Sequence, residues 1–423
     1  MNLSLGIDFG TSGARAIAIN SKGAIAAQTT VTASLDWDQM LWQLLQTLPI
    51  EVRSQLNRIA INGTSSTVLL CDRAGVPITA PLMYDDARGA SVLEQIKSIA
   101  PAQHTVISAT SSLAKLLWWQ ANNESFSNAQ YFLHQADWLA FQLHGQLGIS
   151  DYHNALKLGY DVERLEYPDW LPLRELLPIV VEPGNAIAPI QAAISERFNI
   201  PSTCQICAGT TDSIAAFIAS QANESGDAVT SLGSTLVLKL LSDVRVDRSD
   251  FGIYSHRFGN RWLVGGASNT GGAVLQHFFT TDELRELSDR IPDQESLLDY
   301  YPLLKAGDRF PINDPMLTPR LEPRPDDPVA FLHGLLESMA RIEAQGYRSL
   351  ESFGATPLKR VLTAGGGAKN TAWTAMRQRQ LKVPVMQANQ TEAAYGTALL
   401  AMRGGLKNPG RLGVSLWNES NGM

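Results

Sequence analysis

Two short segments, one in each half of the chain, have the pattern of a β-hairpin whose tip can hold phosphate. The first, residues 8–15, reads Asp-Phe-Gly-Thr-Ser-Gly-Ala-Arg and lies between the apolar runs 3–7 and 16–19. This spacing predicts a strand, a tight Gly/Thr/Ser turn and a second strand. The tip would present N–H groups and hydroxyls to phosphate oxygens, and the carboxylate of Asp8 could hold the accompanying Mg²⁺ through water.

The second copy begins about halfway along the chain, at residues 227–241, with Gly233, Ser234 and Thr235 between apolar runs. Two such hairpins favour a duplicated fold with a nucleotide bound between the halves. The chain has no G-x-x-x-x-G-K-[ST] segment, so the expected mode of ATP binding is not the helical phosphate loop. An ordinary glycine turn is the alternative reading of each hairpin.

Composition limits the classes of function. A chain of 423 residues has room for two or three domains. The net charge of −7 argues against nucleic acid or an acidic membrane as the main partner. No apolar run reaches the roughly 20 residues of a membrane span, and the early acidic residue indicates no targeting peptide. Three cysteines suit a reducing compartment, so we expect a cytoplasmic protein. We expect Cys204 and Cys207 to be buried strand residues rather than a redox or metal pair.

Apolar periodicity predicts an α/β alternation. The expected strands are 58–62, 68–71, 205–208, 261–265 and 360–363. The expected helices are 35–48, 87–99, 113–122, 134–143, 213–222, 273–279, 328–350, 371–381 and 392–402. The last of these is rich in small residues and suits close packing. Residues 168–189 are expected to be a surface excursion, and residues 311–328, with six prolines, a linker or lid-like loop.

Short motifs spread over the chain in one order resemble the FGGY carbohydrate kinases, members of the sugar kinase, actin and Hsp70 superfamily. The motifs are residues 8–15, 84–88, 209–212 and 231–235, and the glycine-rich turn 365–370 followed by 392–396. Within the family, the chain looks similar to the short cyanobacterial and plant pentulose kinases. The resemblance implies two ribonuclease-H-like α/β domains hinged around a central ATP/sugar cleft. Their expected bounds are 1–219 plus 392–423 for the sugar and phosphate side, and 220–391 for the adenosine side.

The resemblance places the catalytic aspartate at Asp212, which follows a strand and a glycine turn and opens a helix. There it would accept the proton of a sugar hydroxyl during phosphoryl transfer. A helix N-cap is the alternative role for this residue. Asp8 is the expected Mg²⁺ anchor, with a strand-end turn former as its alternative.

The residues expected to bind ATP lie in both halves. They are Gly10, Thr11, Ser12, Gly13, Arg15, Gly233, Ser234, Thr235, Gly365, Gly366, Gly367, Asn370 and Trp373. The triple glycine would let the backbone approach adenine or ribose closely. Arg15 could instead cover the sheet, Asn370 could be a helix N-terminal residue, and Trp373 a core aromatic.

The residues expected to bind the sugar are Asp8, Ser65, Ser66, Asp85, Arg88, Asp212 and Ser213. The choice between Asp85 and Asp86 stays open. The hydroxyl-rich turn 63–67 resembles ribulose kinases, although plain turn chemistry also explains it. We therefore expect ATP- and Mg²⁺-dependent phosphorylation of a small ketose, D-ribulose to D-ribulose 5-phosphate. The alternatives are D-xylulose, glycerol or another polyol, and, in a different class, an ATPase switch or a sugar sensor. The sequence leaves the oligomeric state open.

Overall fold

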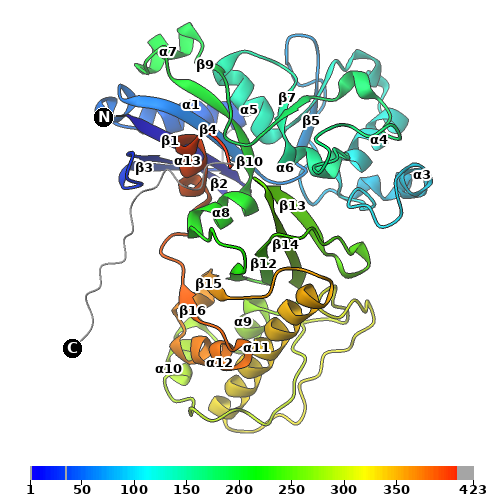
Figure 1. The fold of residues 1–423 in the computed structure, drawn as a ribbon, viewed down its shortest axis with the longest axis vertical. Helices are drawn as coiled ribbons and strands as arrows, with labels where there is room; N and C mark the ends of the chain where they lie inside the picture. The colour runs from blue at the N-terminus through cyan, green and yellow to red at the C-terminus, as the bar shows by residue number, and fades with distance from the viewer. Residues whose placement is uncertain (1, 34–35, 407–423) are drawn as a thin grey trace. The chain divides into compact units, whose positions relative to one another are not determined.

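The computed structural model describes residues 2–33 and 36–406, which form two compact units (Figure 1). Among the described residues, unit 1 comprises residues 2–33, 36–100, 106–219 and 392–406, and unit 2 comprises Pro101–Thr105 and Ser220–Thr391. Residues 407–423 of the expected first domain lie outside the described residues. Each unit combines a mixed sheet with helices, so the predicted two-domain α/β class is confirmed.

Unit 1 is built on a six-stranded sheet with the strand order β3-β2-β1-β4-β10-β9. Its strands are β1 Leu3–Gly10, β2 Gly13–Ile19, β3 Ile25–Thr32, β4 Leu56–Gly63, β9 Ala186–Pro189 and β10 Gln205–Thr211. Strands β1, β4 and β10 are parallel, whereas β2, β3 and β9 pair antiparallel. The predicted first hairpin is confirmed, because β1 ends at Gly10 and β2 begins at Gly13.

The two faces of this sheet are covered differently. Alternate β1 residues such as Leu5 and Ile7 pack into one apolar core with α1 (Trp37–Thr47) and α5 (Gln135–His144). On the other face, α13 (Ala393–Arg403) lies so close to β1 that a Cβ at Gly6 would be 2.1 Å from the Ala394 carbonyl oxygen. The predicted close packing of this small-residue helix is confirmed.

Other parts of unit 1 differ from the expectations. The predicted helix 87–99 is a 3₁₀ turn, Arg88–Val92, followed by α3 (Leu93–Ile99). Gly89 packs against the Ala109 carbonyl, where a Cβ would lie at 2.5 Å, so this position of the turn has no room for a side chain. The predicted excursion 168–189 contributes β9 to the sheet, and an unpredicted strand β6 precedes α5. The remaining elements are α2 Ile50–Arg53, β5 Val68–Cys71, α4 Ser112–Asn122, β6 Tyr131–His134, β7 Ile149–Asp151, α6 Tyr152–Ala155, β8 Ile179–Val181, α7 Ala192–Phe198 and α8 Asp212–Ser220.

Unit 2 has its own six-stranded sheet, ordered β13-β14-β12-β11-β15-β16. Its strands are β11 Asp227–Leu232, β12 Leu236–Ser242, β13 Tyr254–Phe258, β14 Arg261–Ser268, β15 Arg360–Ala364 and β16 Val385–Gln387. Its helices are α9 Gly272–Phe278, α10 Thr281–Ser288, α11 Pro328–Ser352 and α12 Thr371–Leu381. The second predicted hairpin is β11–β12. Asp327 caps α11 by accepting the N–H groups of Val329 and Ala330, which confirms the predicted start of that helix.

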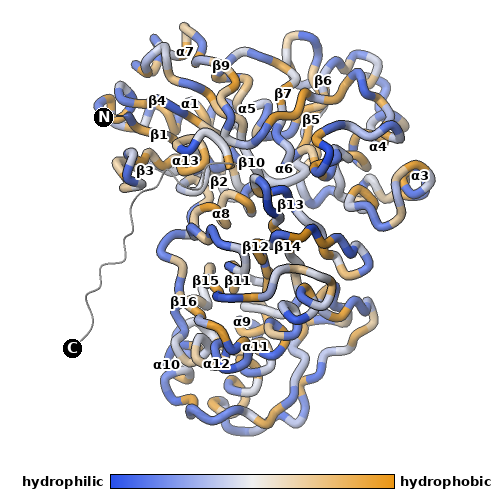
Figure 2. The backbone as a smooth tube through the Cα atoms, viewed as in Figure 1, coloured by the Kyte–Doolittle hydropathy of each residue, from blue (hydrophilic) through white to orange (hydrophobic). Residues whose placement is uncertain are grey.

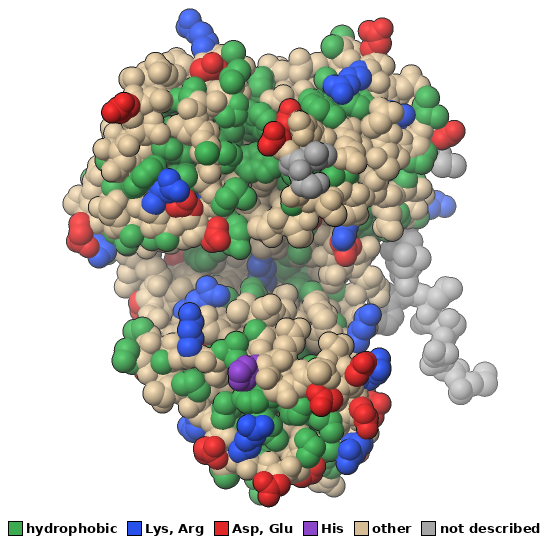
Figure 3. All heavy atoms as spheres, turned by 180° about the vertical axis from the view of Figure 1, so that it is seen from behind, with side chains coloured by type: hydrophobic (Ala, Val, Ile, Leu, Met, Phe, Trp, Pro, Cys, Tyr) green, Lys and Arg blue, Asp and Glu red, His purple; other side chains and the backbone are tan. Residues whose placement is uncertain are grey.

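The hydropathy pattern agrees with this layering. Apolar segments follow the core strands and the inner helices, while polar segments follow many of the connecting loops (Figure 2). On the face drawn in Figure 3, basic and acidic side chains are interspersed, and no extended basic patch is visible there. Across residues 2–33 and 36–406, no helix combines the length and the apolar character that crossing a bilayer requires.

Candidate active site

The carboxyl ends of three neighbouring parallel strands of unit 1 meet at one edge of the sheet. In the register, Asp8 of β1 lies opposite Asn62 of β4, and Thr211 of β10 lies opposite Gly63. Asp212 follows Thr211 directly as the first residue of α8. The two carboxylates that the sequence singled out are therefore brought to the same edge, as happens at the ligand sites of many α/β sheets.

The pKa of Asp8, at this edge of the sheet, is strongly shifted from its ordinary value. Burial, with the nearby charge of Asp212, raises the pKa of Asp8 from 3.8 to about 6, while Arg15 and Asn62 act in the opposite direction. Its Oδ1 atom is buried and accepts no hydrogen bond from any residue that the structure describes. A buried carboxylate oxygen without a donor, on a residue that is itself only partly buried, is poised to accept a hydrogen bond from a ligand or from metal-bound water.

Asp212 is partly exposed at the N-terminus of α8. Its Oδ1 accepts the N–H of Ser213 at 2.6 Å. Ser213 itself is exposed. The carboxylate is thus held at the strand end while part of it remains accessible.

The β1–β2 hairpin presents Thr11 and Ser12 as its exposed tip. Gly13 is required by packing, because it has φ +147° and a Cβ there would lie 2.2 Å from the Val31 carbonyl oxygen. Arg15, the cross-strand partner of Asp8, forms an ion pair with Glu392 just before α13. The structure therefore gives Arg15 a protein partner as well as a place beside Asp8.

The hydroxyl-rich turn that follows β4 is tied to the start of α5. The Gln135 side chain accepts the N–H of Thr64 at 3.1 Å, and the Gln135 N–H donates to the Thr67 carbonyl at 2.9 Å. Ser65 is partly exposed, whereas Ser66 is buried and has φ +64°. The Ser66 hydroxyl has no hydrogen-bond partner among the described residues.

The 84–88 element contains a bidentate ion pair. Arg88 Nε lies 2.8 Å and 2.9 Å from the two carboxylate oxygens of Asp86, and its guanidinium stacks over Trp118 at 4.6 Å. Although burial works against it, the hydrogen bonds from Arg88 lower the pKa of Asp86. Asp85 is exposed. Asp86 therefore orients Arg88, and Asp85 is the carboxylate with more access to solvent.

In unit 2, the triple glycine follows β15 and its three members have different surroundings. A Cβ at Gly365 would lie 2.6 Å from the Leu232 carbonyl oxygen, and one at Gly367 would lie 2.6 Å from the Trp373 ring. A Cβ at Gly366 would meet nothing within 4 Å. Packing explains the first and third glycines, while Gly366 leaves an open backbone surface.

Asn370 and Trp373 support this turn. Asn370 caps α12 by accepting the Trp373 N–H at 2.9 Å, and it donates to Ser288 Oγ at 2.8 Å. Trp373 is 2% exposed and belongs to the core of unit 2. Asn370 is thus a helix N-terminal residue and Trp373 a core aromatic, as the alternative interpretations of these two residues expected.

The second hairpin supports the start of α9. The carbonyl oxygens of Gly233 and Ser234 accept the N–H groups of Gly272 and Ala273 at 2.8 Å and 3.1 Å. Ser234 is exposed, and Thr235 is partly exposed. The turn is therefore held firmly while its tip remains open.

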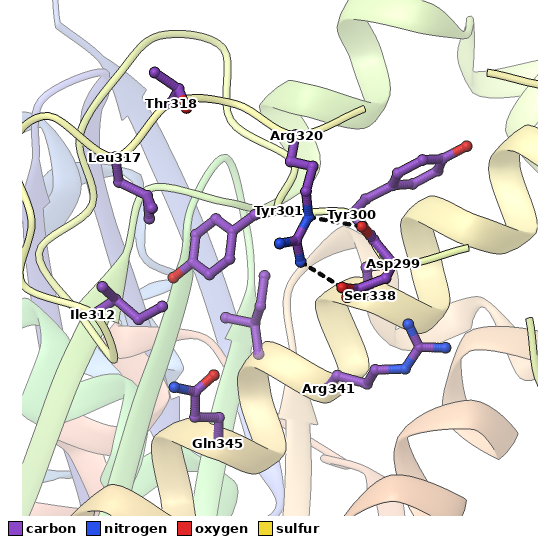
Figure 4. Close-up of a pocket in the computed structure, with 11 residues that line it drawn as sticks. Asp299, Tyr300, Tyr301, Ile312, Leu317, Thr318, Arg320, Ser338, Arg341 and Gln345 are labelled. Atoms are coloured by element: carbon purple, nitrogen blue, oxygen red, sulfur yellow. Dashed lines mark hydrogen bonds and ion pairs between the residues drawn. The ribbon is translucent and has the colours of Figure 1, made fainter. Parts of the chain in front are cut away.

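A pocket of about 310 Å³ lies in unit 2 between α11 and the proline-rich segment, and its lining includes Tyr301, Arg320 and Arg341 (Figure 4). Arg320 donates to the Asp299 carboxylate at 2.7 Å, and Arg341 donates to the Leu298 carbonyl at 2.9 Å. None of the predicted site residues lines this pocket. The proline-rich segment is a loop in this unit, and its lid role stays a prediction.

The predicted burial of Cys204 and Cys207 is confirmed, although Cys204 lies directly before β10 rather than within it. Cys204 and Cys207 are free and buried beside or within β10, and Cys71 is free and buried as well. Burial raises the pKa of Cys204 to about 12 and of Cys207 to about 11, so neither thiol is activated.

Sequence reasoning missed two residues of the strand edge. Asn62 is buried and donates to Thr397 Oγ1 at 2.7 Å, while its Oδ1 has no hydrogen-bond donor among the described residues. The hydroxyl of Thr211 is likewise buried and without a described partner. The signal for Asn62 was a polar residue that ends an apolar strand, next to the turn already singled out.

The donor set fits Mg²⁺ bound mainly through water. Within the described ranges, no group of three or more His, Cys, Asp or Glu side chains is arranged to hold a metal ion. Mg²⁺ keeps several waters and commonly uses one or two carboxylates together with substrate phosphates. Asp8, with its unpartnered buried oxygen, and Asp212 meet that requirement.

Comparisons with known proteins agree over nearly the whole chain. Residues 3–219 match the N-terminal domain, and residues 228–405 the C-terminal domain, of the FGGY family of carbohydrate kinases. A xylulose kinase from Staphylococcus epidermidis is 20% identical over 95% of this chain and 87% of its own length. An L-fuculokinase from Escherichia coli is 23% identical over 93% and 90%. A ligand-bound xylulose kinase from Lactobacillus acidophilus shares the fold, with a TM-score of 0.84, 18% identity and coverage of 97% and 92%.

Proposed function

Since the chain belongs to the FGGY family of carbohydrate kinases and is a sugar kinase, we propose that it transfers the γ-phosphoryl group of ATP to D-ribulose. The observation that carries the proposal is the pairing of Asp8 and Asp212 at one strand edge, beside a turn rich in hydroxyls. D-xylulose is the second candidate, in keeping with the names of several relatives. Glycerol and other polyols follow.

In the proposed reaction, Asp212 is the general base. A hydroxyl oxygen of the sugar attacks the γ-phosphorus, its proton passes to the Asp212 carboxylate, and ADP leaves with the electrons of the broken P–O bond. The Ser213 N–H holds Asp212 Oδ1 at 2.6 Å, which fixes the carboxylate for this transfer. Asp8 would hold Mg²⁺ through water. When bound, Mg²⁺ would neutralise charge on the phosphate oxygens.

ATP contacts are proposed for both units. Thr11 and Ser12, at the exposed tip of the first hairpin, and residues 233–235 of the second would donate hydrogen bonds to the phosphates. Gly366 would let adenosine approach the backbone, because no side chain or neighbouring atom fills that space. Asn370 and Trp373 would keep this turn in place.

Sugar contacts are proposed for Ser65, Ser66, Ser213, Asp85 and Arg88. The buried Ser66 hydroxyl has no described partner, so a sugar hydroxyl would satisfy it. Arg88 is already oriented by Asp86 and by stacking on Trp118, and such preorganisation favours a contact with a ligand.

The three free, buried cysteines suit a reducing compartment, and we place the protein in the cytoplasm.

The test is identification of the product by mass spectrometry and ³¹P NMR after incubation with Mg²⁺–ATP and D-ribulose. We expect wild type to form D-ribulose 5-phosphate, Asp212→Asn to form almost none, and Asp169→Asn, which changes a fully exposed aspartate of the same unit, to match wild type. Inorganic phosphate as the sole product, formed at the same rate with and without sugar, would instead indicate an ATPase switch. Sugar binding without any turnover would indicate a sensor.

A further inference from the structure

We propose that Lys115 is a positioning residue for sugar recognition, because it ties together the two segments of unit 1 that carry the proposed sugar contacts. This inference rests on the proposed function, in which residues 64–67 and 84–88 bind the sugar. Lys115 itself does not touch the substrate, since its side chain is fully buried in α4.

The geometry joins both segments to one cation. Lys115 Nζ donates to the Ser66 carbonyl at 2.7 Å and to the Met83 carbonyl at 2.6 Å. The first acceptor lies in the hydroxyl-rich turn, and the second immediately precedes the 84–88 element. Both bonds are short and charge-assisted, so they restrain the two peptide groups more strongly than neutral hydrogen bonds would.

The cost of keeping a cation here indicates that these bonds matter. Asp86, the carboxylate that most favours the charged form of Lys115, is engaged in the ion pair with Arg88, and burial lowers the pKa of Lys115 to about 8. A buried ammonium group is expensive unless its hydrogen bonds are made. A methionine or leucine would fill the same space without that cost, but it would leave the Ser66 carbonyl without a described donor and the Met83 carbonyl with only the Asp86 N–H, at 3.0 Å.

What Lys115 holds in the turn is an unusual conformation. Ser66 lies in the left-handed region, which non-glycine residues rarely adopt, and its buried hydroxyl lacks a partner among the described residues. Fixing the Ser66 carbonyl restrains the stretch of backbone that carries that hydroxyl. At the other segment, the Met83 carbonyl sets the path of the chain toward Asp86 and Arg88. One side chain thus keeps the two proposed sets of sugar contacts in register.

The experiment compares Lys115→Met with Leu117→Ala. The second variant truncates a buried residue of the same helix that packs in an apolar cluster with Ile96 and Leu113. We expect Lys115→Met to raise the KM for D-ribulose about tenfold or more while the KM for ATP changes less than twofold. Leu117→Ala should lower the melting temperature and leave both KM values unchanged. Equal rises in the two KM values, or an unchanged KM for the sugar in the folded Lys115→Met variant, would overturn the proposal.

Hydrogen–deuterium exchange gives a second measurement that needs no turnover. In ligand-free protein, the amides of residues 64–67 and 84–88 should both exchange faster in Lys115→Met than in Leu117→Ala. If Lys115→Met does not fold, D-ribulose added to wild type should protect both segments together. Faster exchange of only one segment in Lys115→Met, or protection of only one segment by D-ribulose in wild type, would contradict the positioning role of Lys115. Failure of the proposed function would show itself separately, as ADP formation by wild type that no sugar stimulates.

Discussion

Replacing Asp8 with asparagine should stabilise the protein at neutral pH and abolish Mg²⁺-dependent turnover. Burial and the charge of Asp212 raise the pKa of Asp8 from 3.8 to about 6, so the folded protein favours the neutral carboxyl. A pKa shift of that size lowers the free energy of unfolding of the protein with a charged Asp8 by at most about 3 kcal/mol. The asparagine side chain has nearly the same shape as that of aspartate and carries no charge, so Asp8→Asn removes this cost.

The upward direction of the Asp8 pKa shift determines how stability depends on pH. Because the folded pKa is raised, the contribution of the Asp8 carboxyl to stability is complete below its unfolded pKa of 3.8 and is lost as the pH rises through about 6. Asp8→Asn and wild type should therefore have similar stability near pH 4. At pH 8 the variant should melt at a higher temperature by up to roughly 6–12 °C, since about 1 kcal/mol shifts the melting temperature of a domain of this size by roughly 2–4 °C.

The assay is thermal unfolding of both proteins across this pH range, followed by circular dichroism, with ADP formation measured on the same samples. Asp169→Asn is the matched control, because it removes an exposed carboxylate of the same unit and should show no such pH dependence. A stability difference between Asp8→Asn and wild type that is independent of pH would refute the electrostatic reasoning. Wild-type turnover in the stabilised variant would refute the metal role.

Substitutions at Asp212, at Gly366 and Gly367, and at Arg88 test the remaining assignments. Asp212→Asn should lower kcat by about 10²–10⁴-fold, the usual contribution of a general base, while ATP affinity in equilibrium binding stays within about twofold; near-normal kcat would remove it from the mechanism. Gly366→Ala should leave the melting temperature unchanged and raise the KM for ATP, whereas Gly367→Ala should lower the melting temperature through its clash with Trp373; the reverse pattern would contradict the assignment. Arg88→Ala should raise the KM for the sugar and not that for ATP, and an unchanged sugar KM would exclude the contact.

Turnover itself should follow the charge of Asp8. Protonation below about pH 6 removes the carboxylate that would hold Mg²⁺ through water, so kcat/KM for Mg²⁺–ATP should fall as the pH drops through that value.

The sequence predicted those parts of the fold that depend on local chemistry. The first hairpin, in which β1 ends at Gly10 and β2 begins at Gly13, was recognisable because glycine and hydroxyl residues lie between two apolar runs. Close packing of α13 was recognisable from its small residues. Strand β9 was missed because it follows a proline-rich stretch and gains its place only by pairing with β10.

The site was predictable as a set of residues, but its internal contacts were not. The sequence could not choose between Asp85 and Asp86, because the ion pair with Arg88 depends on the path of a 3₁₀ turn. The place of Lys115 in an apolar helix gave no indication of which carbonyls it would reach. Such long-range hydrogen bonds are set by the tertiary fold, which one-dimensional patterns do not record.

The measurement that tests the central claim most directly is ADP formation by purified protein with Mg²⁺–ATP and a panel of D-ribulose, D-xylulose, L-ribulose, glycerol and ribitol, beside a control without sugar. We predict strong stimulation by D-ribulose, with a higher kcat/KM than for any other member of the panel. Preference for D-xylulose would correct the substrate and keep the mechanism. ADP release at the same rate with and without every sugar would contradict the proposed function.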